Sequence, residues 1–337
     1  MVSDLRQGVL RMRSMIVGRT WLSRPMSKLS ALAMAGFLAA CSSAPEIPPA
    51  EQPISKETMM LLGNKGMDTG TPIFIRIFKE ESELEVWKAR TDGRFYHFKT
   101  YPICNWSGGL GPKLEQGDKQ APEGFYTISQ DQMKPDSQYH LAFNMGYPNA
   151  YDRSLGRTGQ YIMVHGNCKS AGCYAMTDAL VEEIYALARE SFKGGQTSFQ
   201  VHAFPFRMTN EKLARYKKHQ WYGFWSTLKQ GYDTFELTRV PPTVAVCEHR
   251  YIVNVELPAT GRIDPESRCP AFRRPLLEPF APRPEEQQLA DERVVVNGPK
   301  VRDMASIEAR PGSVETTAGI ASQPGLPAGA SALGFNQ

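Results

Sequence analysis

Short segments in which apolar and polar residues alternate dominate the first two thirds of the chain. Alternation with a period of two residues is typical of strands that bury one face. The clearest examples are residues 71–78, 84–88 and 94–100, and Thr91-Asp92-Gly93 between the last two predicts a hairpin turn. Further short strands are predicted at 125–129, 139–143, 161–164 and 199–204. With one amphipathic helix late in the order, at 178–192, the pattern predicts a β-rich domain from about residue 69 to 206.

After this domain the pattern becomes helical and then disappears. Residues 208–230 are predicted to be helical, with an aromatic stripe that we interpret as core packing: Trp221, Phe224, Trp225 and Leu228. Residues 244–255 are predicted to add a strand or hairpin arm, which completes an extension over 209–256. Residues 257–337 are rich in Pro, Glu, Arg, Ser, Ala and Gly. We expect this tail to be mostly disordered, because it buries too little apolar surface to offset its ordering entropy.

The strongest apolar run, residues 29–40, is too short to span a bilayer and ends at Cys41. Its length fits the apolar region of a secretory signal, and the small residues before Cys41 resemble the lipobox of bacterial lipoproteins. We therefore predict a signal peptide over 1–40, with Met26 as an alternative start, lipidation at Cys41 and a polar tether over 41–68. The alternative is a buried helix whose cysteine is incidental.

The net charge of +4 is concentrated at the N-terminus, where the first forty residues contain six Lys or Arg and one Asp. The remainder is close to neutral, which argues against a protein that binds nucleic acid by neutralising phosphates. Ser42 resembles the sorting residue of outer-membrane lipoproteins. We therefore expect a periplasmic protein that contacts the membrane through its lipid anchor only, in an oxidising compartment.

Candidate chemistry is concentrated in residues 161–178. Five cysteines follow the candidate lipidation site, so at least one thiol stays free if the others pair. Two of them, Cys168 and Cys173, follow an apolar strand that ends at His165. A nucleophilic thiol needs a base within hydrogen-bond reach and backbone N–H groups for the oxyanion, and Gly172 allows close backbone approach. A zinc site would lack a fourth ligand, and a Cys168–Cys173 disulfide would need an unusually tight loop; both remain alternatives.

This segment resembles the active-site signature of the L,D-transpeptidase catalytic-domain (YkuD-like) family, in which His-Gly precedes Ser/Thr-x-Gly-Cys. Residues 120–126 resemble a second family element. Three further segments resemble features of the YafK-like subgroup of periplasmic murein enzymes: residues 106–113, 148–153 and 204–208. The resemblance covers roughly residues 69–208. It implies a mainly β sandwich or barrel with a helix after the catalytic loop, and a peptidoglycan-modifying cysteine enzyme without cofactor or metal ion.

The resemblance also implies roles for individual residues. Cys173 would be the nucleophile, with a thiolate favoured by the base His165, and the carbonyl of Gly166 would orient the imidazole. The N–H groups of Gly172 and Cys173 would form the oxyanion hole. Ser170 would line the same loop or cap its N–H groups. The other cysteines are expected to pair as Cys104–Cys168 and Cys247–Cys269, which leaves Cys173 free.

Three residues are candidates for binding substrate: Arg153, Lys113 and Tyr126. Arginine suits the bidentate recognition of carboxylates, which peptidoglycan stem peptides carry, but each cation is equally interpretable as a surface charge or a loop-fixing ion pair. Stem peptides are the expected partner, and a wall-attached lipoprotein is a further candidate. Nucleic acid is not.

Three departures from the family pattern bear on the reaction. Only four residues separate His165 from Ser170, and Ala171 and Ala175 stand where the family usually has polar side chains. We therefore expect hydrolysis of a thioester acyl-enzyme at meso-diaminopimelate to be a major route, releasing cross-links or wall-attached lipoprotein. The alternatives are an L,D-transpeptidase that forms 3,3-cross-links or attaches proteins to peptidoglycan, and a non-catalytic wall-binding lipoprotein.

Overall fold

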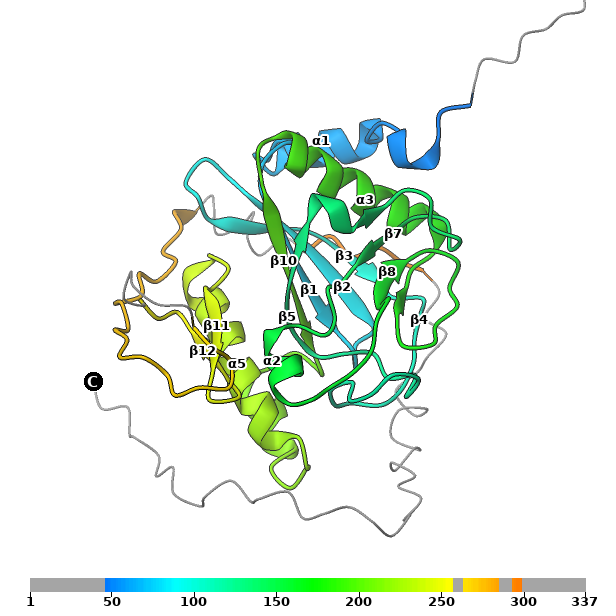
Figure 1. The fold of residues 1–337 in the computed structure, drawn as a ribbon. Helices are drawn as coiled ribbons and strands as arrows, with labels where there is room; N and C mark the ends of the chain where they lie inside the picture. The colour runs from blue at the N-terminus through cyan, green and yellow to red at the C-terminus, as the bar shows by residue number, and fades with distance from the viewer. Residues whose placement is uncertain (1–45, 257–262, 285–292, 299–337) are drawn as a thin grey trace, which may run out of the picture. The chain divides into compact units, whose positions relative to one another are not determined.

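Two five-stranded sheets form the body of the protein. The computed structural model describes residues 46–256, 263–284 and 293–298 (Figure 1). The strands of the first sheet are β1 (Ile73–Phe78), β2 (Glu83–Ala89), β3 (Phe95–Pro102), β5 (Gly124–Ser129) and β10 (Ser198–Phe204). Their order is β3-β2-β1-β10-β5, and only β1 and β10 run parallel. The segments with clear alternation thus become the long strands of one sheet.

The second sheet consists of short strands and contains the candidate chemistry. Its strands are β4 (Asn105–Trp106), β6 (Met133–Lys134), β7 (Ala142–Asn144), β8 (Met163–His165) and β9 (Tyr174–Ala175). Their order is β4-β9-β8-β7-β6, with β8 and β9 parallel and the other neighbours antiparallel. The short helical segment η2 (Gln130–Gln132) leads from β5 of the first sheet into β6, and α2 (Ala150–Ser154) lies between β7 and β8.

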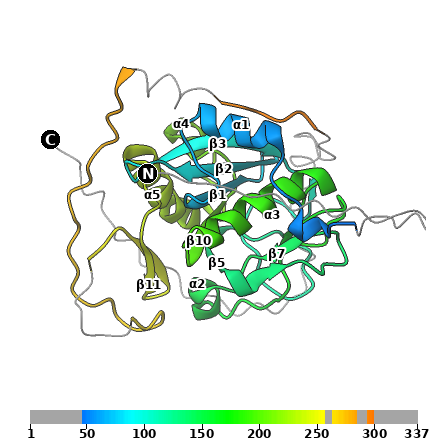
Figure 2. The same ribbon diagram turned by 90° about the horizontal axis from the view of Figure 1, so that it is seen from above.

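One hydrophobic core joins the two sheets. Ile75 and Val201 of the first sheet and Phe143 and Val164 of the second are all fully buried in the same cluster. Helix α3 (Asp178–Lys193) follows the second sheet and buries its apolar stripe against this cluster (Figure 2). Each such buried side chain contributes roughly 1.5–3 kcal/mol. The predicted mainly β sandwich with a helix after the catalytic loop is therefore confirmed.

The predicted tether is wrong over its second half. Residues 49–51 form η1 (Pro49–Glu51), and α1 (Lys56–Asn64) begins at an N-cap where Ser55 accepts a hydrogen bond from the N–H of Thr58. Leu62 of α1 is 1% exposed and belongs to the core shared with the sheets. The sequence did not indicate this helix, because the segment is largely polar. Only Thr58 and Leu62 of α1 are buried, and they attach it to the rest of the protein. The signal peptide and the lipidation of Cys41 lie outside the described residues and stay predictions.

The extension after the sandwich packs on the first sheet. The predicted helix over 208–230 is two helices, α4 (Asn210–Arg215) and α5 (Tyr222–Thr238), and the predicted hairpin is β11 (Val244–Cys247) with β12 (Arg250–Val253). Trp225 of α5 is fully buried and donates its indole N–H to Glu123 at 2.7 Å. The aromatic stripe is therefore core packing, as predicted.

Parts of the tail, which we expected to be mostly disordered, make specific contacts with the rest of the protein. A disulfide joins Cys269 to Cys247 at the end of β11, and Phe280 packs its ring on Tyr96. Farther on, Thr100 of β3 exchanges backbone hydrogen bonds with residues 294 and 296 at 2.8 Å. These contacts are long-range and few, so composition does not reveal them. Among the described residues, no helix has the length and apolar character needed to cross a membrane.

Candidate active site

The two parallel strands of the second sheet bring the candidate base and nucleophile together. His165 ends β8, and Cys173 directly precedes β9; the register pairs Val164 with Tyr174 and His165 with Ala175. The N–H of Met163 donates to the Sγ of Cys173 at 3.4 Å. The thiol in turn lies 3.6 Å from the carbonyl oxygen of Tyr161. The backbone at Tyr161 and Met163 therefore holds the sulfur beside β8, the strand that also carries the imidazole.

The imidazole of His165 is held in one orientation. Its Nδ1 lies 2.6 Å from the carbonyl oxygen of Gly166, which can only accept, so Nδ1 carries the proton. This leaves Nε2 as the basic nitrogen. The ring of Tyr139 lies against the imidazole at a centroid distance of 4.8 Å, and His165 is 3% exposed. Burial lowers the pKa of His165, and the hydrogen bond to Gly166 opposes that effect. The resting imidazole is neutral and ready to accept a proton.

The loop between base and nucleophile is short, and two adjacent residues near its start, Asn167 and Cys168, are held in place. Asn167 and Cys168 both adopt left-handed backbone conformations, with φ of 67° and 50°. The carboxylate of Asp178, at the start of α3, accepts a hydrogen bond from the N–H of Asn167 at 2.7 Å. Cys168 forms a disulfide with Cys104, and Cys173 is left with a free thiol. Both pairs named from the sequence are thus present, and the Cys168–Cys173 alternative is not.

The expected depression of the thiol pKa is wrong for the resting enzyme. Burial raises the pKa of Cys173, and the N–H of Met163 and the charge of Lys113 only partly offset it. Because an ordinary thiol already titrates near ~8.5, the sulfur is protonated at neutral pH. The site therefore holds a neutral thiol and a neutral imidazole at rest.

This charge state predicts a specific pH dependence. The rate of alkylation of Cys173 by iodoacetamide should rise steadily from pH 6 to pH 9, because the thiolate fraction grows as pH approaches the raised pKa of the thiol. A preformed thiolate–imidazolium pair would instead give a plateau at acidic pH. Rates measured by mass spectrometry across this range distinguish the two, and a plateau near pH 6 would contradict the neutral pair.

The expected oxyanion hole is only partly available. The N–H of Gly172 donates to the Oγ of Ser107 at 2.6 Å, so it is occupied. No side chain among the described residues accepts from the N–H of Cys173. Ser170 donates its hydroxyl proton to the carbonyl of Cys173 at 2.7 Å and accepts a longer hydrogen bond from the N–H of Gly172 at 3.4 Å; the second contact fits the capping alternative. Gly172 has a φ of 114°, a conformation that side chains rarely adopt, so glycine is required there.

The three candidate substrate-binding residues are not gathered at the thiol. Tyr126 is 1% exposed and donates its hydroxyl to protein groups 3.3 Å away, so it has no access to substrate. Arg153 is exposed on α2 and lines a hollow in front of β5 that does not include Cys173. Lys113 is buried and paired with Asp118, yet its charge acts on the thiol. Tyr126 is therefore a core residue, and Lys113 acts at the site as a buried charge.

Three residues near the site had no role assigned from the sequence. The ring of Tyr139 covers the imidazole. Tyr161 is 68% exposed, and its carbonyl contacts the thiol. The hydroxyl of Ser107 accepts a hydrogen bond from the N–H of Gly172. Residues 106–108 were noted as a subgroup feature, which was the one available signal for Ser107. Nothing in the local pattern marks either tyrosine, because both reach the site through loops.

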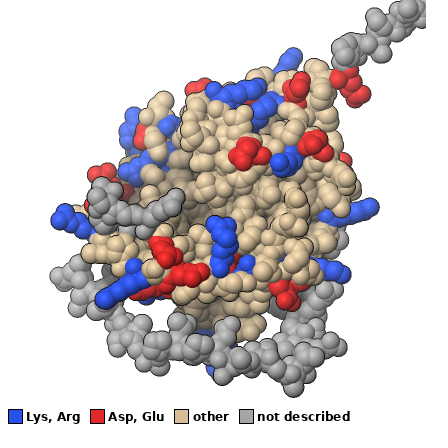
Figure 3. Space-filling model, in the orientation of Figure 1, with Lys and Arg blue, Asp and Glu red and all other residues tan. Residues whose placement is uncertain are grey.

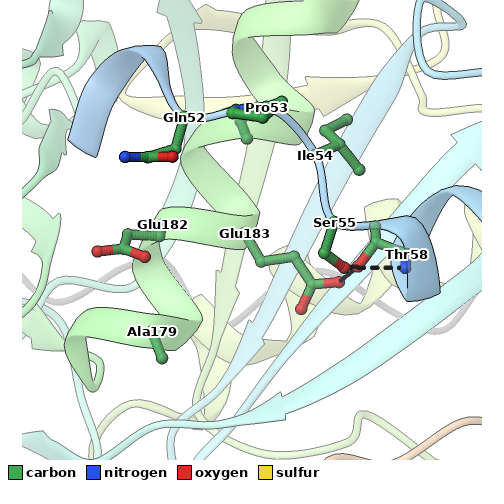
Figure 4. Close-up of a pocket in the computed structure, with 9 residues that line it drawn as sticks. Gln52, Pro53, Ile54, Ser55, Thr58, Ala179, Glu182 and Glu183 are labelled. Atoms are coloured by element: carbon green, nitrogen blue, oxygen red, sulfur yellow. Dashed lines mark hydrogen bonds between the residues drawn. The ribbon is translucent and has the colours of Figure 1, made fainter. Parts of the chain in front are cut away.

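A separate hollow lies between the N-terminal segment and α3 (Figure 4). It is lined by residues of 52–58 and of α3, and Glu183 there accepts a hydrogen bond from Thr58 at 2.6 Å. Neither His165 nor Cys173 lines it. On the face shown in Figure 3, basic and acidic side chains are interspersed. This hollow is therefore separate from the candidate pair in the β8–β9 region.

A β-sandwich that holds a free thiol and a buried, oriented imidazole on adjacent strands has the arrangement of a cysteine-nucleophile enzyme. The family model described as the L,D-transpeptidase catalytic domain, YkuD, matches residues 74–201. The chain is 44% identical over 232 residues to "Putative L,D-transpeptidase YafK" of Escherichia coli K12 and of O157:H7, covering 69% of this chain and 89% of each relative. It therefore belongs to the L,D-transpeptidase family, which modifies peptidoglycan at its stem peptides.

Two solved structures resemble the fold more distantly. The helical cell shape determining protein Pgp2 of Campylobacter jejuni is 18% identical, with a TM-score of 0.33 over 56% of this chain and 80% of that chain. Bd1075 of Bdellovibrio bacteriovorus is 20% identical, with a TM-score of 0.28 over 49% of this chain and 62% of that chain.

Proposed function

We propose that this protein cleaves peptidoglycan stem peptides through a thioester acyl-enzyme at meso-diaminopimelate, with hydrolysis as a major route. The reaction would open cross-links between stem peptides or release a lipoprotein attached to the wall. Family membership supports the substrate class. The arrangement of His165 and Cys173 supports the covalent route, because the pair supplies a base with a defined proton-free nitrogen and a free thiol.

The reaction follows from the resting protonation states. Nε2 of His165 takes the proton of Cys173 as sulfur attacks the amide carbonyl, and the resulting oxyanion is stabilised by backbone N–H groups. The tetrahedral intermediate collapses, the C–N bond breaks, and the imidazolium gives its proton to the leaving amine. Water then enters, His165 accepts one of its protons, and the hydroxide attacks the thioester. The C–S bond breaks, the imidazolium returns its proton to the departing sulfur, and the free carboxylic acid leaves with thiol and neutral imidazole restored.

The short loop between base and nucleophile is the observation that favours water over an amine acceptor. Ala171 is exposed but carries only a methyl group, and Ala175 is fully buried in β9, so neither offers a polar group to an acceptor. The disulfide at Cys168 limits how far the loop can move toward the site. A positioned acceptor gains up to about 7–11 kcal/mol from proximity in intramolecular reactions, and an unpositioned one forfeits this advantage.

Transfer to an amine is the second candidate, and one observation favours it. Lys169 lies exposed in the same loop, three residues after Gly166 and four before Cys173. An exposed ammonium at this place can attract the carboxylate of an acceptor stem peptide. It does so as a mobile point charge rather than as a bidentate clamp, which makes it a weaker positioning device than arginine.

Product analysis separates the two reactions. The soluble protein is incubated with a tetrapeptide donor, with a 3,3-cross-linked muropeptide and with a muropeptide that bears lipoprotein-derived peptide, each with and without added D-amino acid or stem-peptide acceptor. We expect cleavage next to diaminopimelate in the last two substrates, with products that acceptor changes little. Products are identified by mass. Accumulation of new 3,3-cross-links, with attached peptides left intact, would contradict the hydrolytic proposal.

A further inference from the structure

The hydroxyl of Ser107 belongs to a hydrogen-bond chain whose direction is fixed. Ser170 donates its one hydroxyl proton to the carbonyl of Cys173 at 2.7 Å, because a carbonyl can only accept. The Oγ atoms of Ser107 and Ser170 lie 3.2 Å apart, so Ser107 must be the donor in that pair. Ser107 in turn accepts from the N–H of Gly172 at 2.6 Å, which is much shorter than the second contact of that N–H, with the Oγ of Ser170 at 3.4 Å. The chain therefore runs from the Gly172 N–H through both hydroxyls to the Cys173 carbonyl.

Ser107 is held rigidly in this position. It directly follows β4, whose Trp106 pairs with Tyr174 of β9 and is 1% exposed. Its own carbonyl accepts from the N–H of Ala121 at 2.9 Å. The loop that continues from it is fixed by Gln120, whose side chain exchanges hydrogen bonds of 2.7 and 2.8 Å with the backbone of Gly109. The backbone around Ser107 therefore already holds its hydroxyl in the position in which it contacts the nucleophile loop.

The consequence concerns the backbone on both sides of the nucleophile. Holding the Gly172 N–H and the Cys173 carbonyl fixes the two peptide groups that flank the intervening Gly172–Cys173 peptide. That intervening peptide carries the N–H of Cys173. We propose that Ser107 is a positioning residue that aims the N–H of Cys173 as the oxyanion donor while the N–H of Gly172 stays committed to the hydroxyl chain. This inference rests on the proposed acyl transfer and specifies how its oxyanion is stabilised.

Two reactions of the same thiol test the proposal, because only one of them forms an oxyanion. Acylation by a carbapenem or by a donor tetrapeptide passes through an anionic tetrahedral species, whereas alkylation by iodoacetamide does not. Both rates are measured on the wild type, Ser107→Ala, Ser107→Thr and Ser226→Ala. Ser226 is the matched control, because among the described residues its hydroxyl bonds only to the carbonyl of Tyr222 within α5, at 2.8 Å.

We expect Ser107→Ala to slow acylation by about ten- to a hundred-fold, less than the loss seen when an oxyanion donor is itself removed. Its alkylation rate and the pH profile of that rate should match the wild type, as should both rates in Ser226→Ala. Ser107→Thr, which keeps a hydroxyl, should recover most of the acylation rate. Ser170→Ala combined with Ser107→Ala should be little worse than either alone, because the two hydroxyls act as one chain.

Equal loss of both reactions in Ser107→Ala would mean that the serine only maintains the fold around the thiol, and would overturn the proposal. Unchanged acylation would overturn it as well. A wild type that is alkylated but never acylated would instead remove the proposed function itself, and this inference with it. The three failures give different pairs of rates, so they are distinguishable within one experiment.

Discussion

Replacing Cys173 with alanine should abolish both turnover and covalent labelling by a carbapenem, with a loss of activity of roughly 10⁴-fold or more. The reason is that Cys173 is the free cysteine among the described residues, while the other four are paired in disulfides. No other described thiol lies beside the oriented imidazole of His165. Intact-mass measurement after incubation shows directly whether the adduct forms, and muropeptide digestion shows whether turnover survives.

The matched control removes the neighbouring disulfide without leaving an unpaired thiol. The double variant Cys104→Ala with Cys168→Ala should still form the adduct, although more slowly, because Cys173 and His165 remain while the loop between them loses its covalent anchor. An adduct that persists on Cys173→Ala would refute the assignment of the nucleophile. Loss of labelling in the double variant together with normal labelling of Cys173→Ala would transfer the role to the Cys104–Cys168 pair.

The sequence was sufficient to place a helix or strand wherever that element is long enough to show a periodic pattern of apolar residues. The strands of the first sheet alternate over six to eight residues, and the apolar stripe of α3 spans four turns, so their positions were predicted closely. The two-residue strands β4, β6 and β9 were not predicted, because two residues cannot show a period. Their existence depends on neighbours in the sheet, which only the folded chain supplies.

The candidate site divides in the same way. His165, Gly166 and Cys173 lie within nine residues, at the end of a predicted strand and in the loop that follows it, so their proximity was predictable. Ser107 and Tyr139 reach the same place from distant loops, and no local pattern identifies them. The direction of the thiol pKa was missed for a further reason. Burial is a property of the packed molecule, and here it outweighs the effects of the Met163 N–H and of Lys113, so the thiolate expected from the neighbouring His165 is not favoured at rest.

The same limit applies to the charged core of the first sheet, where sequence alternation gave no warning of a buried ionic network. Glu85 is fully buried, and its Oε2 accepts hydrogen bonds from Arg76 at 2.7 and 3.0 Å. Its Oε1 accepts from Arg207 at 2.7 Å and from Arg293 at 3.0 Å. One carboxylate thus connects β1, β2, the segment after β10 and the ordered part of the tail. Burial alone would raise the pKa of Glu85, but the charge of Arg76, followed by that of Arg207, holds it well below its usual range.

Glu85→Gln should therefore be strongly destabilising. It leaves the buried guanidinium of Arg76 with its remaining ion pair to Glu236, and Arg207 with its remaining ion pair to Glu83. Breaking a buried pair in this way costs about 3–5 kcal/mol of unfolding free energy, which lowers the melting temperature by about 10 °C for a domain of this size. Non-reducing thermal denaturation at pH 7 measures the change, with the exposed Glu57→Gln as control.

The sign of the pH dependence provides the decisive check on this prediction. A carboxyl whose folded pKa lies below its unfolded value of ~4.3 stabilises the protein fully above that value, and the contribution falls as pH drops toward the folded pKa. The difference in melting temperature between wild type and Glu85→Gln should therefore be constant from pH 8 to pH 5 and narrow below about pH 4. A difference that stays constant down to pH 3 would show that the loss comes from packing of the amide and not from the missing charge. A melting temperature equal to that of Glu57→Gln at pH 7 would show that the network contributes little to stability.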